Sequence, residues 1–262
     1  KAKALKTDAL GDLWVGLFPN GLDHGSRFAN QFCVVQNASD ASGLSHKSVL
    51  SLMAHPDANN IWIGTENGLN HYTANSKQFT QYIPAPGDTS QLQSGPILAL
   101  AKGESNDELW LSAWGSGIYN FNLKTRQFTQ IAAQPSRPDG LKTSEIWAML
   151  RAHDGTLYLG GSGGGLQIYR GNGRFEHFAV EPGNPASISN NYLRSLLQTR
   201  SGRIFVGTAS GLDEFLPDKK QFVRWLRNEQ GEFKIGATVM ALFEGRDGTL
   251  WVGTHGAGLI SI

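Results

Sequence analysis

Residues 13–16 read Leu-Trp-Val-Gly, and this pattern of aliphatic, aromatic, aliphatic and small residues returns five more times along the chain. The later copies are Ile61-Trp62-Ile63-Gly64, Leu109-Trp110-Leu111-Ser112, Leu157-Tyr158-Leu159-Gly160, Ile204-Phe205-Val206-Gly207 and Leu250-Trp251-Val252-Gly253. The aromatic residue stands at 14, 62, 110, 158, 205 and 251, so that the steps are 48, 48, 48, 47 and 46 residues. A spacing this regular over the whole chain indicates tandem structural repeats.

Each repeat contains four strand-like runs separated by turn-forming residues. In the second repeat these runs are 49–53, 61–64, 68–72 and 78–82, with Pro56-Asp57 and Glu66-Asn67-Gly68 between them. No segment has a sustained 3.6-residue apolar period, so we expect no helix of any length. A period of 40 to 50 residues that carries four strands is typical of β-propeller blades.

The sequence therefore predicts an all-β protein, a β-propeller of six four-stranded blades of about 47 residues each. We expect one propeller domain over residues 1–262. Its repeats fall approximately at 1–44, 45–92, 93–141, 142–188, 189–235 and 236–262. A phenylalanine marks the fourth strand of the first five repeats at Phe32, Phe79, Phe128, Phe175 and Phe222. The sixth repeat lacks it, so the last blade is expected to be incomplete, with an unpaired edge at Leu259 to Ile262. The pattern leaves open whether six blades form the whole ring or part of a longer propeller.

Two further columns of residues fit blade packing. A glycine follows the aromatic residue by six or seven positions and precedes Leu or Ile in every repeat, where it allows positive φ in the hairpin between the second and third strands. Small residues occupy one position of every first strand: Ala4, Ser51, Ala99, Ala148, Ser195 and Ala241. We interpret this small column as packing between blades near the propeller axis. The tryptophans Trp62, Trp110 and Trp251 are predicted to be buried between neighbouring blades.

Composition excludes several classes of function. The net charge is +1 and only 17% of residues are charged, so no basic surface for nucleic acid is expected. Cys33 is the only cysteine, which rules out an internal disulfide framework and a cysteine-rich zinc site. None of the seven histidines, His24 among them, stands at metal-ligand spacing, so we predict no metal site and no cofactor.

The repeats closely resemble a known family. Asp247-Gly248-Thr249-Leu250-Trp251-Val252-Gly253-Thr254 matches the pattern of the two-component regulator propeller repeat throughout, and residues 153–160 nearly do. The resemblance implies a periplasmic sensor propeller of a hybrid histidine kinase or of a membrane-anchored diguanylate cyclase. Any kinase or cyclase activity would then lie outside this chain, in a parent protein anchored in the inner membrane. The resemblance identifies no signal, because the matching residues are structural.

Unusual residues near one rim of the propeller are the best ligand-binding candidates. In the hairpins between second and third strands these are Phe18, Glu66, Trp114 and His255. Where first strands begin, near the same face, they are Trp147, Tyr192 and Arg194. Exposed aromatic side chains beside polar groups suit sugars and other small molecules, so we expect an oligosaccharide or small-molecule ligand, or a scaffold that mediates dimerisation. Packing at the rim is the simpler interpretation of each residue.

An enzyme is the main alternative function. Propellers host glycoside hydrolases and polysaccharide lyases, and glycoside hydrolysis uses a pair of carboxylates. Glu66, Glu145 and Glu214 fall near strand ends, yet nothing in the sequence brings two of them together. We therefore predict no catalytic residues in this chain.

Overall fold

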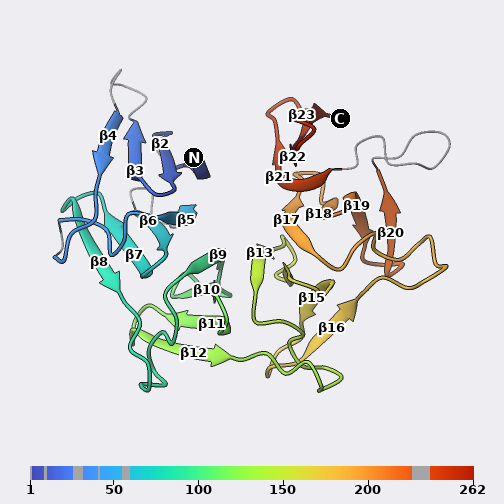
Figure 1. The fold of residues 1–262 in the computed structure, drawn as a ribbon, viewed down its shortest axis with the longest axis horizontal. Coiled ribbons are helices and arrows are strands. Elements are labelled where there is room, and N and C mark those ends of the chain that lie inside the picture. Colours follow the sequence, from blue (N-terminus) through green and yellow to red (C-terminus); the bar gives the residue numbers. More distant parts are fainter. Residues whose placement is uncertain (1, 9–10, 26–31, 41, 55–59, 226–236) are drawn as a thin grey trace. The chain divides into compact units, whose positions relative to one another are not determined.

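A computed structural model describes residues 2–8, 11–25, 32–40, 42–54, 60–225 and 237–262. Its secondary structure is entirely β: the described residues form strands β1 to β23 and contain no helix (Figure 1). No described segment is a helix long and apolar enough to cross a membrane. The chain divides into a first part, residues 1–131, and a second part, residues 132–262.

The first part contains three antiparallel sheets of four strands, each a blade whose strands pair in chain order. Blade 1 has β1 (Ala2–Thr7), β2 (Leu13–Leu17), β3 (Gly21–Gly25) and β4 (Phe32–Val35); blade 2 has β5 (Val49–Ala54), β6 (Asn60–Thr65), β7 (Gly68–Thr73) and β8 (Gln78–Tyr82); blade 3 has β9 (Ile97–Lys102), β10 (Glu108–Ala113), β11 (Gly117–Asn122) and β12 (Gln127–Ile131).

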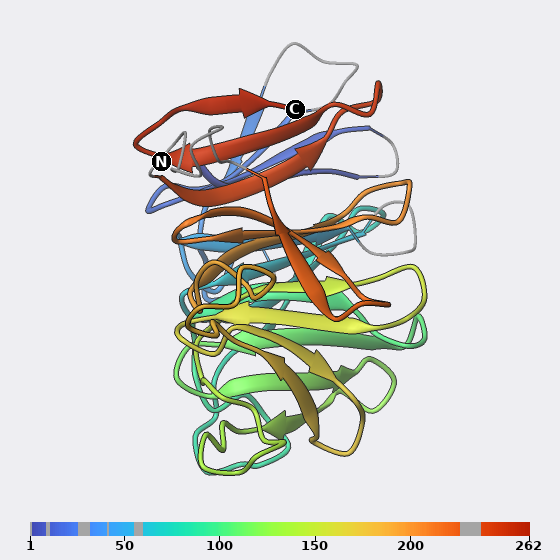
Figure 2. The same cartoon turned by 90° about the vertical axis from the view of Figure 1, so that its right-hand side faces the viewer.

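The second part contains two four-stranded blades and one of three strands, which Figure 2 shows one above another. Blade 4 has β13 (Ile146–Arg151), β14 (Leu157–Gly161), β15 (Leu166–Tyr169) and β16 (Phe175–Phe178); blade 5 has β17 (Leu193–Gln198), β18 (Ile204–Thr208), β19 (Gly211–Leu216) and β20 (Gln221–Arg224); blade 6 has β21 (Thr238–Glu244), β22 (Leu250–His255) and β23 (Leu259–Ser261).

These sheets confirm the predicted β-propeller, with one blade for each sequence repeat. The five phenylalanines lie in the fourth strands β4, β8, β12, β16 and β20, and blade 6 ends after its third strand, as expected. That residues 1–262 form a single domain stays a prediction.

The small column in the first strands is explained by the strand register. Each of its members pairs with the last residue of an aliphatic-aromatic-aliphatic-small motif, for example Ser51 with Gly64 and Ser195 with Gly207. A Cβ built on Gly64 would lie 2.2 Å from Ser51 Oγ and 2.7 Å from the carbonyl oxygen of Ile97, the first residue of the next blade's inner strand. Two small residues on paired strands therefore let the next blade approach the backbone closely.

The glycine that opens or directly precedes each third strand is needed for backbone conformation. Gly68 has φ 106° and Gly211 has φ 126°, a region that L side chains rarely adopt. A Cβ on Gly68 would also lie 2.2 Å from the carbonyl oxygen of Tyr82. The glycine of this hairpin is therefore fixed both by φ and by the close approach of the fourth strand.

The aromatic column forms the core between neighbouring blades. Trp62 is 1% exposed, stacks on His71 at 4.2 Å and contacts the edge of Phe121 in blade 3 at 6.0 Å between ring centroids. Tyr158 of blade 4 lies edge-on to Phe215 of blade 5 in the same way. Trp62 and Tyr158 are thus each covered by an aromatic residue on the third strand of the blade that follows.

The prediction that Trp251 is buried is wrong. Trp62 and Trp110 are buried as expected, at 1% and 4% exposure, whereas Trp251 of blade 6 is 39% exposed. The ring of Trp62 is covered by Phe121 of the next blade, but no described strand follows blade 6 to cover Trp251. Burial of this column depends on the following blade and not on the motif itself.

A column of buried polar residues anchors the lead-in of four blades, where a lead-in is the segment before a blade's first strand. The residue two positions after the glycine of the hairpin between the second and third strands accepts a hydrogen bond from a lead-in backbone N–H of the same blade. The acceptors are Asn70 (from Ser45), Tyr119 (from Gln93), Gln167 (from Lys142) and Asp213 (from Ser189). Their residues are at most 1% exposed, so these hydrogen bonds satisfy polar groups that would otherwise be costly to bury. This column has no common sequence signature, because its residue types differ.

An ion pair in blade 5 leads to a prediction about acid stability. Arg203 donates two hydrogen bonds of 2.8 Å to Glu214, whose side chain is 10% exposed. These bonds hold the pKa of the Glu214 carboxyl below its usual range; burial opposes the shift, and a hydrogen bond from the Trp225 indole adds to it. A lowered pKa means that the pair stabilises the fold above the ordinary carboxyl pKa of 4.5 and that this stabilisation is lost as the pH falls through the lowered value.

We therefore expect Glu214→Gln to lower the melting temperature at pH 7 and to lower it by less at pH 3, because part of the stabilisation is lost once the pH falls below 4.5. The measurement is thermal unfolding followed by circular dichroism across this range. Asp218→Asn, at an exposed position of the same blade, is the control and should follow the wild-type curve. An equal loss at both pH values for Glu214→Gln would show that the ion pair is not the cause.

Candidate functional site

The inner strand of every blade contains one β-bulge, which leaves one residue of that strand without a partner in its pairing with the second strand. The pairing of β13 with β14 skips Trp147, and the pairing of β17 with β18 skips Arg194. The bulged residues along the chain are Lys3, Leu50, Leu98, Trp147, Arg194 and Met240. A bulge re-aims its side chain relative to the rest of the strand. The side chains of these bulged residues are therefore not required for the packing between blades.

In the second part, the bulged residues Trp147 and Arg194 lie close to Tyr192, another ligand-binding candidate from the sequence. The Arg194 guanidinium carbon lies 3.5 Å from the centroid of the Trp147 ring. The Tyr192 ring lies 6.4 Å from the Trp147 ring, tilted by 31°, and Tyr192 is 48% exposed. Strands β13 and β17 of adjacent blades bring Trp147 and Arg194 together, and Tyr192 ends the lead-in of β17. We call Trp147, Tyr192 and Arg194 the aromatic–arginine cluster.

Backbone hydrogen bonds position Tyr192 in the cluster. Its N–H donates to Asn190 Oδ1 at 2.8 Å, and its carbonyl oxygen accepts from the Ala209 N–H at 2.9 Å. The lead-in of blade 5 is thus tied to the hairpin between β18 and β19. The Tyr192 ring is exposed while its backbone is fixed on both sides.

Arg194 is a half-buried cation without a hydrogen-bonded carboxylate. Burial lowers the pKa of its guanidinium, and the negative charge of Glu145 opposes that shift. Within the described part of the chain, no side chain or carbonyl accepts a hydrogen bond from this guanidinium. Stacking on Trp147 holds its plane and leaves its N–H groups available to a ligand.

The other predicted ligand-binding residues are not part of this cluster. Phe18, Glu66 and Trp114 lie in the first part, on three different blades. Lys3 Nζ lies 5.8 Å from the Phe18 ring, and Glu66 lies 3.5 Å from His46 Nδ1. Trp114 is 48% exposed, and its backbone N–H donates to the Pro96 carbonyl. His255 ends β22 and is exposed.

One polar hollow in the first part was not predicted. It has a volume of about 290 Å³ and is open to solvent. The hairpin after β2, the start of the lead-in to blade 2 and Lys47 line it through Pro19, Asn20, Gly21, Gln36, Asn37 and Lys47. It lies beside the Phe18–Pro19 peptide, which is cis. Its amide side chains could bind a polar molecule, but all of them are exposed and none is oriented by a buried partner.

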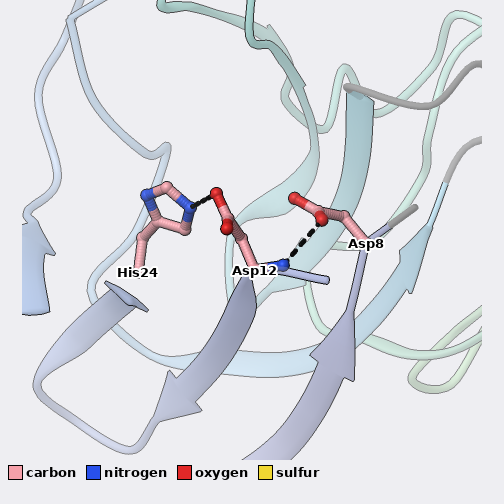
Figure 3. A group of neighbouring side chains, drawn as sticks. All are labelled: Asp8, Asp12 and His24. Atoms are coloured by element: carbon pink, nitrogen blue, oxygen red, sulfur yellow. Dashed lines mark hydrogen bonds and ion pairs between the residues drawn. The ribbon is translucent and has the colours of Figure 1, made fainter. Parts of the chain in front are cut away.

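Blade 1 also contains an Asp8, Asp12 and His24 group, shown in Figure 3, whose ligand atoms lie within 4.8 Å of one another. Asp8 accepts hydrogen bonds from the Asp12 backbone N–H at 3.0 Å and from the Trp14 indole at 2.9 Å. His24 Nε2 lies 3.3 Å from Asp12 Oδ2, and its ring stacks on Trp14 at 4.0 Å. Both oxygens of Asp8 are thus used within the protein, and the group explains how the Trp14 ring is held. The absence of a metal site stays a prediction.

Two of the carboxylates considered for catalysis each have a basic neighbour within their own part of the chain. Glu66 lies in the first part beside His46, whereas Glu214 is bound by Arg203 in the second. The lowered pKa of Glu214 is also the opposite of what a general acid at neutral pH needs. The described residues therefore give no support to a two-carboxylate mechanism.

The family model described as two component regulator propeller matches residues 235–256. The sixth repeat is a two-component regulator propeller repeat. This confirms the resemblance inferred from residues 247–254. A search of curated proteins gives no match to the chain.

Several solved structures share the β-propeller fold over the full chain. The extracellular domain described as that of the hybrid two component system BT3049 from B. thetaiotaomicron is 23% identical, with a TM-score of 0.81, over 100% of this chain and 33% of that one. The extracellular domain of the one component system BT4673 from the same organism is 17% identical, with a TM-score of 0.65, over 100% of this chain and 40% of that one. The chain thus spans about a third to two fifths of these domains.

Not all similar propellers are parts of regulators. A catalytically inactive virginiamycin B lyase from Staphylococcus aureus, solved with quinupristin, is 10% identical, with a TM-score of 0.70, over 99% of this chain and 83% of that one. At these identities the structural likeness establishes the propeller fold alone.

Proposed function

We propose that this chain is part of the extracytoplasmic sensor propeller of a bacterial signal-transduction protein and binds a small molecule or oligosaccharide at the aromatic–arginine cluster. The parent protein would be anchored in the inner membrane, with the propeller in the periplasm and its output activity elsewhere. Two-component regulator propeller repeats and the likeness to extracellular domains of regulators support the sensor context.

The observation that carries the binding proposal is the convergence of Trp147, Tyr192 and Arg194 from two adjacent blades. Bulges release Trp147 and Arg194 from the ladder, and Arg194 stacks on Trp147 at 3.5 Å. Structural packing would place such side chains in the interblade core, as it does Tyr158 and Phe205. Exposed aromatic faces beside a cation are instead common in sites for sugars and other polar ligands.

Enzymatic activity is the second candidate function, and the structural likeness to a lyase is the reason to test for it. A propeller hydrolase or lyase would consume its ligand, whereas a sensor binds it and leaves it intact. A scaffold that only mediates dimerisation would bind no small ligand at all. The three functions therefore predict different results from one screen.

The screen measures the melting temperature of the chain against a panel of oligosaccharides and other small polar molecules, with product analysis of every hit. For a true ligand we expect stabilisation without turnover, because binding to the folded state alone contributes about 2.7 kcal/mol at a ligand concentration of 100 Kd. Turnover of a hit would support the enzyme instead, and no hit in the whole panel would contradict the binding proposal.

We expect Trp147→Ala to weaken binding of a hit by at least about tenfold, a typical loss for removing a central aromatic contact. The measurement is isothermal titration calorimetry. Arg246→Gln, at an exposed position of the same part, is the control and should bind as the wild type does. Unchanged affinity in Trp147→Ala, with the variant folded, would place the ligand at another site.

A further inference from the structure

Arg194 differs from the other stacked arginine of the second part in one respect. Arg203 stacks on Phe205 and Trp225 at 4.8 and 4.7 Å and also binds Glu214 through two hydrogen bonds. Arg194 stacks on Trp147 more closely, at 3.5 Å, but no described carboxylate lies within ion-pair distance of it. The two arginines thus share an aromatic platform, and only Arg203 has an anionic partner within the protein.

A half-buried guanidinium without such a partner is costly unless something else accepts its hydrogen bonds. Water can accept them in the free protein, and a ligand oxyanion would accept them better. A guanidinium held in a fixed plane matches the two oxygens of a carboxylate or of a sulfate ester. Its position beside the exposed ring of Tyr192 allows one ligand to contact both groups.

Glu145 adds a negative charge in the neighbourhood of Arg194. It lies close enough to affect the Arg194 charge but does not form an ion pair with it. Its backbone carbonyl accepts a hydrogen bond from Ser162, which fixes the end of the lead-in to blade 4. A bound anion would therefore be attracted by Arg194 and repelled, at a longer distance, by the Glu145 carboxylate.

We infer that the ligand of the aromatic–arginine cluster carries an oxyanion group, a carboxylate or a sulfate ester, which pairs with Arg194 in the way that Glu214 pairs with Arg203. This inference rests on the proposed function and adds the charge of the ligand to it. The remainder of the ligand packs against the rings of Tyr192 and Trp147.

The test uses matched pairs of oligosaccharides that differ only in charge. One arm compares an oligogalacturonate with its methyl ester, and the other compares a sulfated chondroitin oligosaccharide with its desulfated form. Calorimetry on the wild type should give at least about tenfold tighter binding of the acidic member in one arm, since hydrogen bonds to charged groups are the stronger ones. Whichever arm responds distinguishes the carboxylate from the sulfate ester.

Three variants locate the effect. Arg194→Gln should remove the preference for the acidic member, so that the two members of a pair bind with affinities within about twofold of each other. Arg194→Lys keeps the charge but not the planar fork and should retain part of the preference. Glu145→Gln removes the repelling charge and should tighten binding of the acidic member by a few-fold. Arg246→Gln is the control for loss of an exposed positive charge. Melting temperatures show whether each variant is folded.

The outcomes separate this inference from the proposed function. If the neutral members bind as tightly as the acidic ones, or if a preference survives in folded Arg194→Gln, the inference is overturned while ligand binding at the propeller stands. If Arg194→Gln does not fold, Arg194→Lys is tested in its place. An undiminished preference of Arg194→Lys for the acidic member would then overturn the inference. If no member of either pair binds, and the broader screen also finds no ligand, the proposed function is overturned and the inference with it.

Discussion

Replacing Trp62 by alanine should lower the free energy of unfolding by about 3–5 kcal/mol, as large-to-small changes of buried aromatic residues do. Trp62 is 1% exposed and contacts three rings: His71 on its own blade, Tyr82 of β8 and Phe121 of blade 3. Its removal leaves a cavity at the contact of two blades, where neither sheet can move inward without losing its own pairing. Urea denaturation followed by fluorescence and circular dichroism measures the change.

The matched control is Trp251→Ala, which removes the same residue type from the same motif position. Trp251 is 39% exposed, so the loss there should be well below that at Trp62. Equal losses at the two sites would mean that the motif position itself, and not the covering blade, determines the stabilisation. A loss under about 1 kcal/mol at Trp62 would contradict its place in the core.

Gly64→Ala should be nearly as damaging, although it adds only one methyl group. The new Cβ would lie 2.2 Å from Ser51 Oγ and 2.7 Å from the Ile97 carbonyl oxygen, distances that require strand β5 and blade 3 to shift. Overpacking of this kind costs about 1–3 kcal/mol and occasionally more. Because one of the clashing atoms belongs to backbone, we expect the upper end of that range in urea denaturation.

Gly253→Ala is the control at the equivalent position of blade 6. There the nearest atom to an added Cβ is the Ala241 Cβ at 3.5 Å, an ordinary van der Waals contact. Its free energy of unfolding should therefore stay within about 1 kcal/mol of the wild type. If Gly64→Ala were equally mild, the close approach of blade 3 to β6 would not exist in solution.

The fold could be read from the sequence because its signals are local and repeated. The aliphatic-aromatic-aliphatic-small motif marks the second strand, and a glycine such as Gly68 marks the start of the third. Each motif reflects a constraint on packing or backbone conformation that all six blades share. Its repetition in six blades distinguishes the motif from a chance match. The burial of Trp251 was mispredicted for the same reason: the motif reports what a blade needs, whereas burial also requires a neighbour.

The candidate site could be predicted only in part. Trp147, Tyr192 and Arg194 were selected because they depart from the repeat at positions near one rim. Their meeting depends on bulges in β13 and β17, and a one-residue bulge changes which side chain leaves the ladder without changing the motif around it. The sequence nonetheless contained a signal for the bulged position. The residues directly before the small column share no residue class: they are Lys3, Leu50, Leu98, Trp147, Arg194 and Met240. A position free to vary beside an invariantly small one is typical of a side chain released from packing.

The polar column that anchors the lead-ins has a consequence for how such a protein can grow and change. Because Asn70, Gln167 and Asp213 each bind the lead-in of their own blade, a segment cut from one lead-in to the next carries both members of every such bond. Duplication or exchange of that segment in the gene would break none of them. The partner types also differ freely among amide, carboxylate and phenol, so a transplanted blade would need no matching residue in its new neighbours. A new rim, with new recognition residues, could therefore be acquired one blade at a time.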